Sequence, residues 1–201
     1  MGLKKELLLE GMLKAIEEFT YLKTEDIPDI HLYMDQVTTL MDERLKTTSR
    51  KPSEDKVLTK TMINNYAKNN LLPSPEKKKY SKDHILILIF IYYYKGFLTI
   101  ADIQALLKPL TEQFFGEQGS VGLAEIYEQI LEVQKAQLEE IKVDIERKVN
   151  QASEMFTQIE GITEEQEEFL QLFSFISFMG SDVYFKKLMI ERIMDERFKD
   201  E

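Results

Sequence analysis

Apolar residues recur at intervals of three and four along most of this chain, and few helix-breaking residues interrupt them. Among 201 residues there are only 8 glycines and 5 prolines. This spacing places apolar side chains on one side of an α-helix, whereas strict alternation would indicate strands. The sequence therefore predicts a mainly α-helical protein.

Breaking residues divide the pattern into separate helices. The predicted helices cover residues 1–21, about 30–46, 59–69, a segment that begins at 81, 99 to about 109, 123–156, 163–179 and about 182–199. The apolar run 85–94 fits a buried helix or a strand by periodicity, and the capping signal at Ser81 favours the helix. Three parts follow: an N-terminal amphipathic helix (1–26), a compact module (27–110) and a helical region (111–201), with a glycine-containing connector at 115–122.

Positive charge is concentrated in one part of an acidic chain. Residues 44–95 contain twelve Lys or Arg and four acids, a net +8, while the remainder carries −18 of the total of −10. Such asymmetry indicates one face suited to a polyanion on a molecule that otherwise repels it. A solvated basic surface is the plainer alternative.

The composition excludes several kinds of site. Without cysteine the chain has no disulfide, thiolate metal ligand or thiol nucleophile. Two histidines are too few for a histidine-based metal site, and we expect no metal or cofactor. No P-loop, dinucleotide fingerprint or nucleophile elbow occurs, so we expect no enzymatic activity. The longest apolar run has ten residues, about half of a membrane span, and we expect a cytoplasmic protein that does not enter membranes.

The segment from residue 59 to 69 has the strongest chemical pattern. On a helix, Met62, Ile63, Tyr66 and Ala67 would form an apolar face. The opposite face would carry Thr61, Asn64, Asn65 and Lys68. Asparagine is a mediocre helix former, but its amide can pair with adenine in the major groove, and lysine can meet guanine or phosphate. An ordinary polar surface is the alternative.

A lysine-rich loop follows within twenty residues. Lys77, Lys78 and Lys79 precede Tyr80 in a stretch with two prolines, which predicts an exposed loop or small hairpin. A basic loop beside a polar helix can hold the phosphate backbone while the helix enters the groove. Loops with three lysines also occur merely for solubility.

These motifs together resemble the winged-helix module of MerR-type transcription regulators. The resemblance spans about residues 58–107 and rests on three ordered segments: LTKTMINNYAKNNLLP (58–73), KYS (79–81) and LTIADIQALL (98–107). Asn64 stands where the family usually has a phosphate-binding arginine, Asn70 stands in the place of a glycine, and the wing is short and lacks its glycine. A similar run also occurs in a bacterial family known only as a domain of unknown function, whose members share the N-terminal half.

The resemblance implies a winged helix-turn-helix followed by an all-helical region, in a sequence-specific regulator of transcription that binds double-stranded DNA. The helix would read the major groove, and the wing would lie on phosphates. The predicted DNA-binding residues are Thr59, Lys60, Thr61, Asn64, Asn65, Tyr66, Lys68, Lys77, Lys78, Lys79 and Tyr80. The rival hypothesis is a helical protein-interaction adaptor that retains the winged fold and does not bind DNA, which the missing arginine and the acidic remainder favour.

The C-terminal half is expected to assemble the molecule. MerR-type regulators dimerise through a long helix after the module, and residues 123–156 are its counterpart here, so we expect a homodimer through this helix. Intramolecular packing of the same stripe is the alternative. Since metal and redox sensors of that family use cysteines, any effector of this chain would be organic or another protein. The aromatic cluster at 169–179 fits a helical core or dimer contact, or an apolar ligand cavity. His84 is expected to pack or to cap a helix rather than to bind a ligand.

Overall fold

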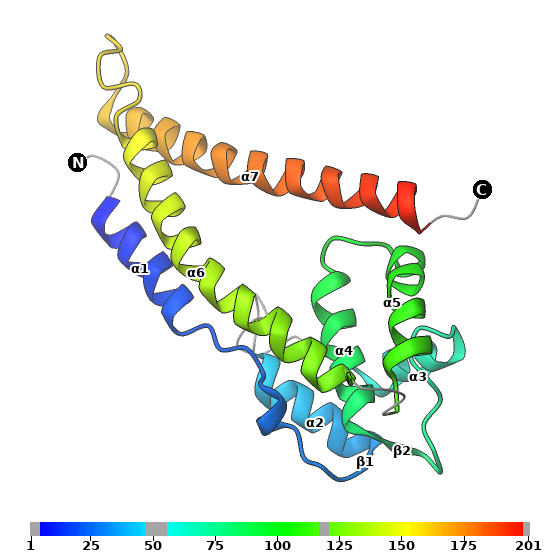
Figure 1. Ribbon diagram of the computed structural model, residues 1–201. Coiled ribbons are helices and arrows are strands. Elements are labelled where there is room, and N and C mark those ends of the chain that lie inside the picture. The colour runs from blue at the N-terminus through cyan, green and yellow to red at the C-terminus, as the bar shows by residue number, and fades with distance from the viewer. Residues whose placement is uncertain (1–4, 47–55, 117–120, 199–201) are drawn as a thin grey trace. The chain divides into compact units, whose positions relative to one another are not determined.

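The computed structural model describes residues 5–46, 56–116 and 121–198, and it is mainly α-helical, as the sequence predicts (Figure 1). Its elements in chain order are α1 (Lys5–Glu17), the 3-10 helix η1 (Thr24–Asp26), β1 (Leu32–Tyr33), α2 (Met34–Leu45), α3 (Lys60–Lys68), β2 (Lys79–Tyr80), α4 (Lys82–Tyr94), α5 (Ile100–Phe114), α6 (Leu123–Ser153) and α7 (Glu164–Arg197). The predicted loop at 47–55 and part of the 115–122 connector lie outside the described residues.

The chain divides into two compact units, and the ends of α6 and α7 belong to different units. The first unit comprises residues 1–20 and 133–190. The second comprises residues 21–132 and 191–201. Each has its own buried core, and each is described by itself below. No helix in the described ranges is long and apolar enough to cross a membrane.

Helix α4 forms the centre of the second unit. Every residue from His84 to Ile91 is buried. A helix that is apolar on all sides must be covered on all sides, which explains why its periodicity alone did not separate helix from strand. Its start is fixed by Ser81, whose backbone N–H donates to Nδ1 of His84 at 3.0 Å. The preference for a helix is confirmed, as is the capping role of His84.

A short antiparallel sheet joins the segment before α2 to the segment before α4. β1 pairs with β2 in the register Leu32 with Tyr80 and Tyr33 with Lys79. The expectation of a helix from about residue 30 was therefore wrong at its start. Tyr33 remains extended as the N-cap of α2, and its N–H donates to Oε1 of Gln36 at 2.8 Å. The partner strand lies some fifty residues away, so no local pattern revealed it.

Two other predicted boundaries differ from the structure. α5 continues past Pro109 to Phe114, although proline lacks the N–H that would bond to the carbonyl of Ala105. Ala105 is only partly buried, so water can reach that carbonyl. α7 is one helix that passes through Gly180, where a break was expected. A glycine inside a helix costs only about 1 kcal/mol, which 34 residues of continuous hydrogen bonding easily outweigh.

The first unit is a three-helix arrangement of α1, the second half of α6 and most of α7. Ile145, Val149 and Ala152 of α6 are buried with Phe175 of α7, and four residues of α1 pack against them: Leu8, Leu9, Met12 and Ile16. Lys148, only 5% exposed, forms ion pairs with Asp144 of its own helix and with Asp182 of α7. Burial by itself would lower the pKa of Lys148, but hydrogen bonds to both carboxylates raise it above its usual value.

Candidate nucleic-acid interface

Helix α3 is divided into the two faces that its sequence predicts. Ile63 and Tyr66 are buried, and Met62 and Ala67 are partly buried. The opposite face is exposed along its whole length and consists of Thr61, Asn64, Asn65 and Lys68. The helix therefore has its apolar side in the core and presents two amides, a hydroxyl and an ammonium group to solvent.

Both ends of α3 are defined by side chains that the sequence identified. Thr59 is the N-cap, and its Oγ1 accepts from the backbone N–H of Met62 at 3.2 Å. Asn70 follows the helix with a φ of +56°, in the left-handed region that glycine usually occupies. Asparagine is among the few other residues that tolerate this region, which explains how Asn70 replaces a glycine here. The helix is thus held at nine residues, with its polar face centred between the caps.

The lysine-rich segment forms a tight hairpin. Glu76 and Lys79 form a bridge, and the N–H of Lys79 donates to the carbonyl of Glu76 at 2.9 Å. Between them Lys77 and Lys78 have φ values of +50° and +64°. Two consecutive positive φ values define the turn that normally requires Asn-Gly, so two lysines here strain the backbone. Both side chains are exposed at the tip.

The start of α3 and the hairpin converge on the first turn of α2. Lys60, the first residue of α3, forms an ion pair with Asp35. On the other side, the ammonium group of Lys79 lies 5.3 Å from the ring centroid of Tyr33, two residues before Asp35. Helix α3 and the basic hairpin are thereby tied to the same short stretch of backbone.

Two of the predicted contact residues lie in the core instead of on the surface. Tyr66 is 7% exposed and Tyr80 is 3% exposed, so neither ring is available to a ligand. Burial raises the pKa of both hydroxyls above the usual value near 10. Their roles are to anchor α3 and the end of the hairpin, and we omit them from the proposed contacts. The other nine predicted residues are exposed or partly exposed.

Sequence reasoning missed how His84 supports the hairpin. Its ring makes edge contacts with Tyr80, at 5.4 Å between centroids, and with Phe115, at 4.8 Å. Burial holds the pKa of His84 below its usual value near 6.5, and the nearby carbonyls of Ser74 and Pro73 oppose this shift only in part. The ring therefore packs between Tyr80 at the end of the hairpin and Phe115 at the end of α5. The pattern Ser-x-x-His resembles a capping box and was the available signal.

Part of the positive charge in this unit is neutralised by neighbouring acids. Arg44 pairs with Asp26 and Lys82 with Asp29, in addition to the pair between Lys60 and Asp35. Lys95 is half-buried and donates to the carbonyl of Val57 at 3.1 Å. Within the described ranges no ion pair is recorded for Lys68 or Lys78. Lys77 at the hairpin tip pairs with Glu76, whereas Lys68 on α3 and Lys78 at the tip are two exposed cations for which the described residues supply no ion pair.

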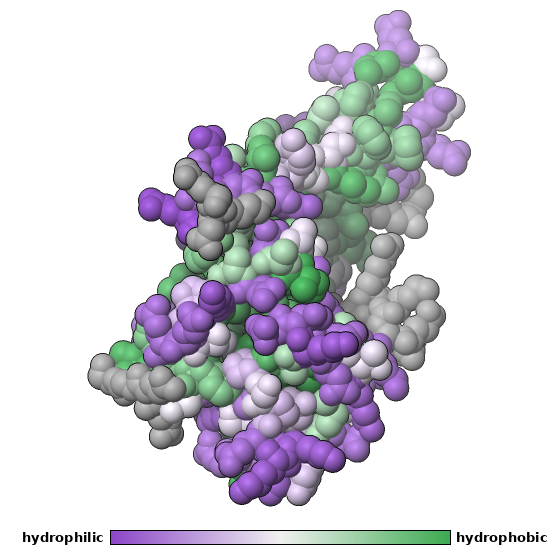
Figure 2. Space-filling view, turned by 90° about the vertical axis from the view of Figure 1, so that its right-hand side faces the viewer, coloured by the Kyte–Doolittle hydropathy of each residue, from purple (hydrophilic) through white to green (hydrophobic). Residues whose placement is uncertain are grey.

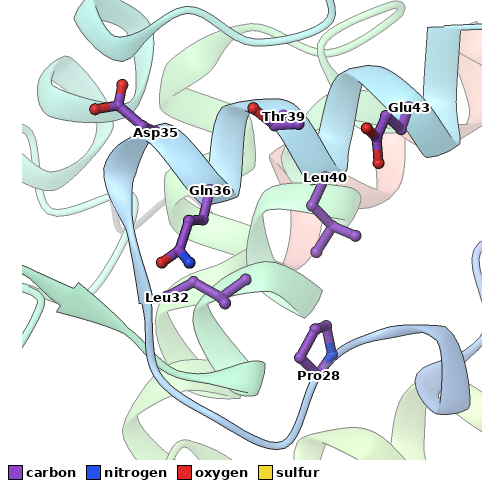
Figure 3. A pocket seen from close by; sticks show the side chains of 7 residues that line it. All are labelled: Pro28, Leu32, Asp35, Gln36, Thr39, Leu40 and Glu43. Atoms are coloured by element: carbon purple, nitrogen blue, oxygen red, sulfur yellow. The ribbon is translucent and has the colours of Figure 1, made fainter.

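A shallow cavity of ≈ 330 Å³ lies on the opposite side of α2 from its buried face (Figure 3). Its apolar floor is formed by Pro28, Leu32 and Leu40, as Figure 3 shows, and Asp35 and Glu43 lie at its two ends along the helix. Apolar floors with acidic groups at the rim suit a small organic group that carries a donor or a positive charge. The buried residues on the other face of α2 are Val37, Met41 and Leu45.

Comparison with known proteins gives a family match and no functional assignment. Residues 22–130 match the model of a family described as a domain of unknown function (DUF1836). The matched segment nearly coincides with the 21–132 part of the second compact unit, which contains α3 and the hairpin. Neither a curated protein nor a solved structure matches the chain.

Proposed function

We propose that this chain, which belongs to the DUF1836 family, a domain of unknown function, is a sequence-specific DNA-binding regulator of transcription with a MerR-like winged helix. Helix α3 reads the major groove through Thr61, Asn64, Asn65 and Lys68. The hairpin places Lys77, Lys78 and Lys79 on the phosphate backbone. Thr59 and Lys60 lie at the entry of the helix into the groove.

The observation that carries the proposal is the exposed polar face of α3. Asn64 and Asn65 occupy the middle of a nine-residue helix, where they weaken it and contribute nothing to its buried side. Amide side chains on an exposed short helix are the groups that pair with the N6 and N7 atoms of adenine. Lys68, on the same face, has no recorded acidic neighbour in the described part of the chain.

The order of elements supports the winged-helix interpretation. A helix (α2) is followed by a second short helix (α3), a hairpin, and two further helices (α4 and α5), and β1 pairs with the strand that ends the hairpin. This arrangement allows α3 to enter a groove while the hairpin contacts the adjacent backbone. The strained turn supports the same view, because Lys77 and Lys78 keep two charges where Asn-Gly would be more stable.

Fluorescence anisotropy of the full chain against a randomised duplex pool, followed by selection, tests the proposal. We expect enrichment of a short motif and an affinity that falls with added salt. With about five phosphate contacts, the slope of log K against log salt is expected to lie near −4 to −5. Binding that appears only at low salt and enriches no sequence would contradict the proposal.

Substitutions separate base recognition from backbone contact. Replacing Asn64 or Asn65 with Ala should cost about 1–3 kcal/mol of binding and relax specificity at one position. Replacing Lys77, Lys78 and Lys79 together with Ala should weaken binding to all sequences alike and reduce the salt slope by up to about 3. The exposed Lys135 of α6 supplies the control, since its replacement with Ala should change neither property.

A protein-interaction adaptor that retains this fold is the second candidate. The ion pairs of Arg44, Lys60 and Lys82 favour it, because they remove part of the charge that a duplex would meet. An adaptor that does not bind DNA would enrich no sequence from the duplex pool, and the selection experiment separates the two functions.

Partners beyond DNA belong to the same proposal. We propose a homodimer, for which the sequence suggests helix 123–156. Ile145 and Val149 of that stripe pack inside the chain, which favours the intramolecular alternative for much of this helix; Ile130, Val133 and Ile141 are its exposed remainder. An organic effector would find an apolar floor in the cavity beside α2. The C-terminal aromatic cluster is the other candidate for an effector site, but its Phe175 packs in the core.

A further inference from the structure

The outer face of α7 carries a row of exposed apolar side chains. Phe169, Phe173, Ile176 and Val183 are 63%, 58%, 59% and 65% exposed. They follow one another at four-, three- and seven-residue intervals, and Gly180 occupies the position between the last two. This alternation of four and three is the spacing of a coiled-coil seam. We call these five residues the α7 row.

The α7 row lies opposite the face by which the helix packs within its own unit. Gln171, Ser174 and Phe175 are buried, and Phe175 belongs to the core shared with α6. α7 is therefore apolar on two sides, and one of them is covered. Figure 2 shows hydrophobic side chains at the surface among hydrophilic ones. Helices of this kind are stable in water when a partner covers the second side.

The row is large enough for a specific interface. Together with the adjacent Tyr184, which is 62% exposed, its side chains would bury on the order of 500 Å² per protomer. Two copies would then bury about 1,000 Å², which reaches the lower bound for a biological interface. Gly180 leaves a gap in the row between Ile176 and Val183, because it has no side chain and a Cβ placed there would meet open space. An aromatic ring from a partner can occupy that space.

Charge along α7 is arranged so that the helix complements itself when reversed. The first turn is acidic, with Glu164, Glu165 and Glu167, and Lys186 and Lys187 lie about twenty residues later. An antiparallel copy would bring the acidic end of each helix to the lysines of the other. Two-fold symmetry requires this kind of self-complementary surface.

We propose that two copies of the chain pair through the α7 row as an antiparallel, two-fold symmetric helix pair. Phe173 packs on Ile176 of the second copy, and Phe169 fills the gap at Gly180. In the same register Glu165 lies opposite Tyr184 of the second copy, and Lys186 of that copy follows within one helical turn, about 3 Å further along the axis. The pairing does not depend on DNA binding, and it assigns the dimer to α7 instead of α6.

The composition of α7 argues against a lipid surface as the occupant. Amphipathic helices that lie on membranes carry lysines and arginines along their polar face, which anionic headgroups attract. α7 begins with acids, and the chain has a net charge of −10. Anionic headgroups would repel it. A second copy supplies both the apolar contact and the opposite charges.

Light scattering coupled to size-exclusion chromatography, with sedimentation equilibrium on the full chain, provides the test. We expect a mass twice the 23.7 kDa of one chain at micromolar concentration. Phe173→Glu should raise the dissociation constant by about 100-fold or more, because each dimer would bury two carboxylates at its centre. Its side chain is exposed in the single chain, so circular dichroism should show unchanged helix content. Val133→Glu on α6, at a residue 59% exposed, is the matched control and should leave the dimer intact.

Charge reversal tests the register separately. Glu165→Lys and Lys186→Glu alone should each weaken the dimer several-fold at low salt, because like charges would face each other. The double variant restores opposite charges and should return the dissociation constant to within about twofold of the original.

Three outcomes would overturn the proposal. The original chain could remain a monomer at all accessible concentrations. Val133→Glu could abolish the dimer while Phe173→Glu preserves it, which would assign the interface to α6. The chain could co-sediment with anionic phosphatidylserine vesicles through residues that Phe173→Glu disrupts, without dimerising. Failure of the double charge reversal to restore pairing would overturn the antiparallel register.

Discussion

At the scale of single residues, the hairpin tip shows a conflict between stability and charge. Lys77 and Lys78 adopt left-handed backbone conformations that cost non-glycine residues about 1–3 kcal/mol each. No side-chain contact in the described structure compensates for the strain at Lys78. The pair contributes two exposed ammonium groups at the most prominent point of the hairpin. The binding role that we propose would account for the strain, whereas solubility could be obtained at unstrained positions.

Replacing Lys77-Lys78 with Asn-Gly tests this interpretation. We expect thermal or urea unfolding to show a gain of about 1–2 kcal/mol, because Asn-Gly suits this turn. DNA binding, measured by anisotropy, should weaken at the same time through the loss of two charges. The Lys77→Ala, Lys78→Ala variant is the control, since it removes the charges and leaves the strain. A stabilised variant that binds DNA as tightly as the original chain would show that the lysines serve another purpose.

Two tyrosines in one aromatic cluster should respond to the same substitution with opposite signs. The hydroxyl of Tyr127 donates to the carbonyl of Leu22 at 2.5 Å, while that of Tyr93 is buried without a hydrogen-bond partner among the described residues. Tyr127→Phe should therefore lower the free energy of unfolding by about 1–2 kcal/mol. Tyr93→Phe should leave it unchanged or raise it by up to about 1 kcal/mol.

Urea unfolding of both variants measures these changes, and absorbance titration gives a second readout. Burial raises the pKa of Tyr93 to about 12, and the pKa of Tyr127 is raised further by the same cause. In Tyr93→Phe, the ionisation near pH 12 should disappear from the titration. Equal destabilisation by both substitutions would mean that the Tyr93 hydroxyl has a partner in solution.

At the scale of secondary-structure elements, the start of α4 contains a cap that depends on protonation. Nδ1 of His84 accepts a hydrogen bond from the N–H of Ser81, which requires this nitrogen to be unprotonated. Burial lowers the pKa of His84 in the folded state below the value near 6.5 of an unfolded chain. The unfolded state consequently binds more protons just below pH 6.5. The stability that His84 contributes is therefore fully present above pH 6.5. It declines as the pH falls from 6.5 to the lowered pKa of the folded state.

Urea unfolding between about pH 7.5 and pH 5 tests this dependence. The variant His84→Gln keeps the helix cap, because the side-chain oxygen of Gln can also accept a hydrogen bond from the Ser81 N–H. Unlike His, Gln does not titrate. We expect the original chain to lose stability more steeply than His84→Gln below pH 6.5, with a difference in slope of at most about 1.4 kcal/mol per pH unit. His31→Gln at an exposed site is the control. Identical slopes for the original chain and His84→Gln would exclude His84 as the group responsible.

Helix starts were the features that the sequence predicted best, because caps depend on residues three positions apart. Thr59, Thr99 and Thr163 stand at three predicted starts, and the side chain of each accepts the backbone N–H three residues later. The exposed face of α3 was predicted for the same reason, since a helical period alone places Asn64 and Lys68 together. Local rules therefore gave the helical class, most element starts and the composition of the candidate surface.

Features that depend on distant residues were missed. β1 exists through its pairing with β2, and nothing near Leu32 indicates a strand. The break expected at Gly180 and the end expected at Pro109 failed because packing and continuous hydrogen bonding outweigh a single unfavourable residue. The convergence of Lys60 and Lys79 on the start of α2 likewise required the fold. Tyr66 and Tyr80 were included among the DNA contacts because a sequence motif does not report burial, although the helical period already placed Tyr66 on the apolar face.

At the scale of the whole molecule, the division into two units separates the family domain from the dimer that we propose. The family match ends near residue 130, and the first segment of the second unit ends at residue 132, inside the single helix α6. The α7 row belongs to the other unit, to which neither α3 nor the hairpin contributes a residue. A helix shared by two cores can transmit local unfolding from one unit to the other or confine it.

Hydrogen exchange of two matched core variants distinguishes these possibilities. Val149 is fully buried in the first unit and Ile87 is fully buried in α4 of the second. Val149→Ala and Ile87→Ala should each lower stability by about 2–4 kcal/mol through lost burial and a residual cavity. We expect Val149→Ala to speed exchange in α1 and in residues 133–190 while α3 and α4 keep their protection. Ile87→Ala should produce the reverse pattern. Equal loss of protection in both units by either variant would show that α6 couples them into one cooperative structure, and α3 could then not be positioned independently of the α7 row.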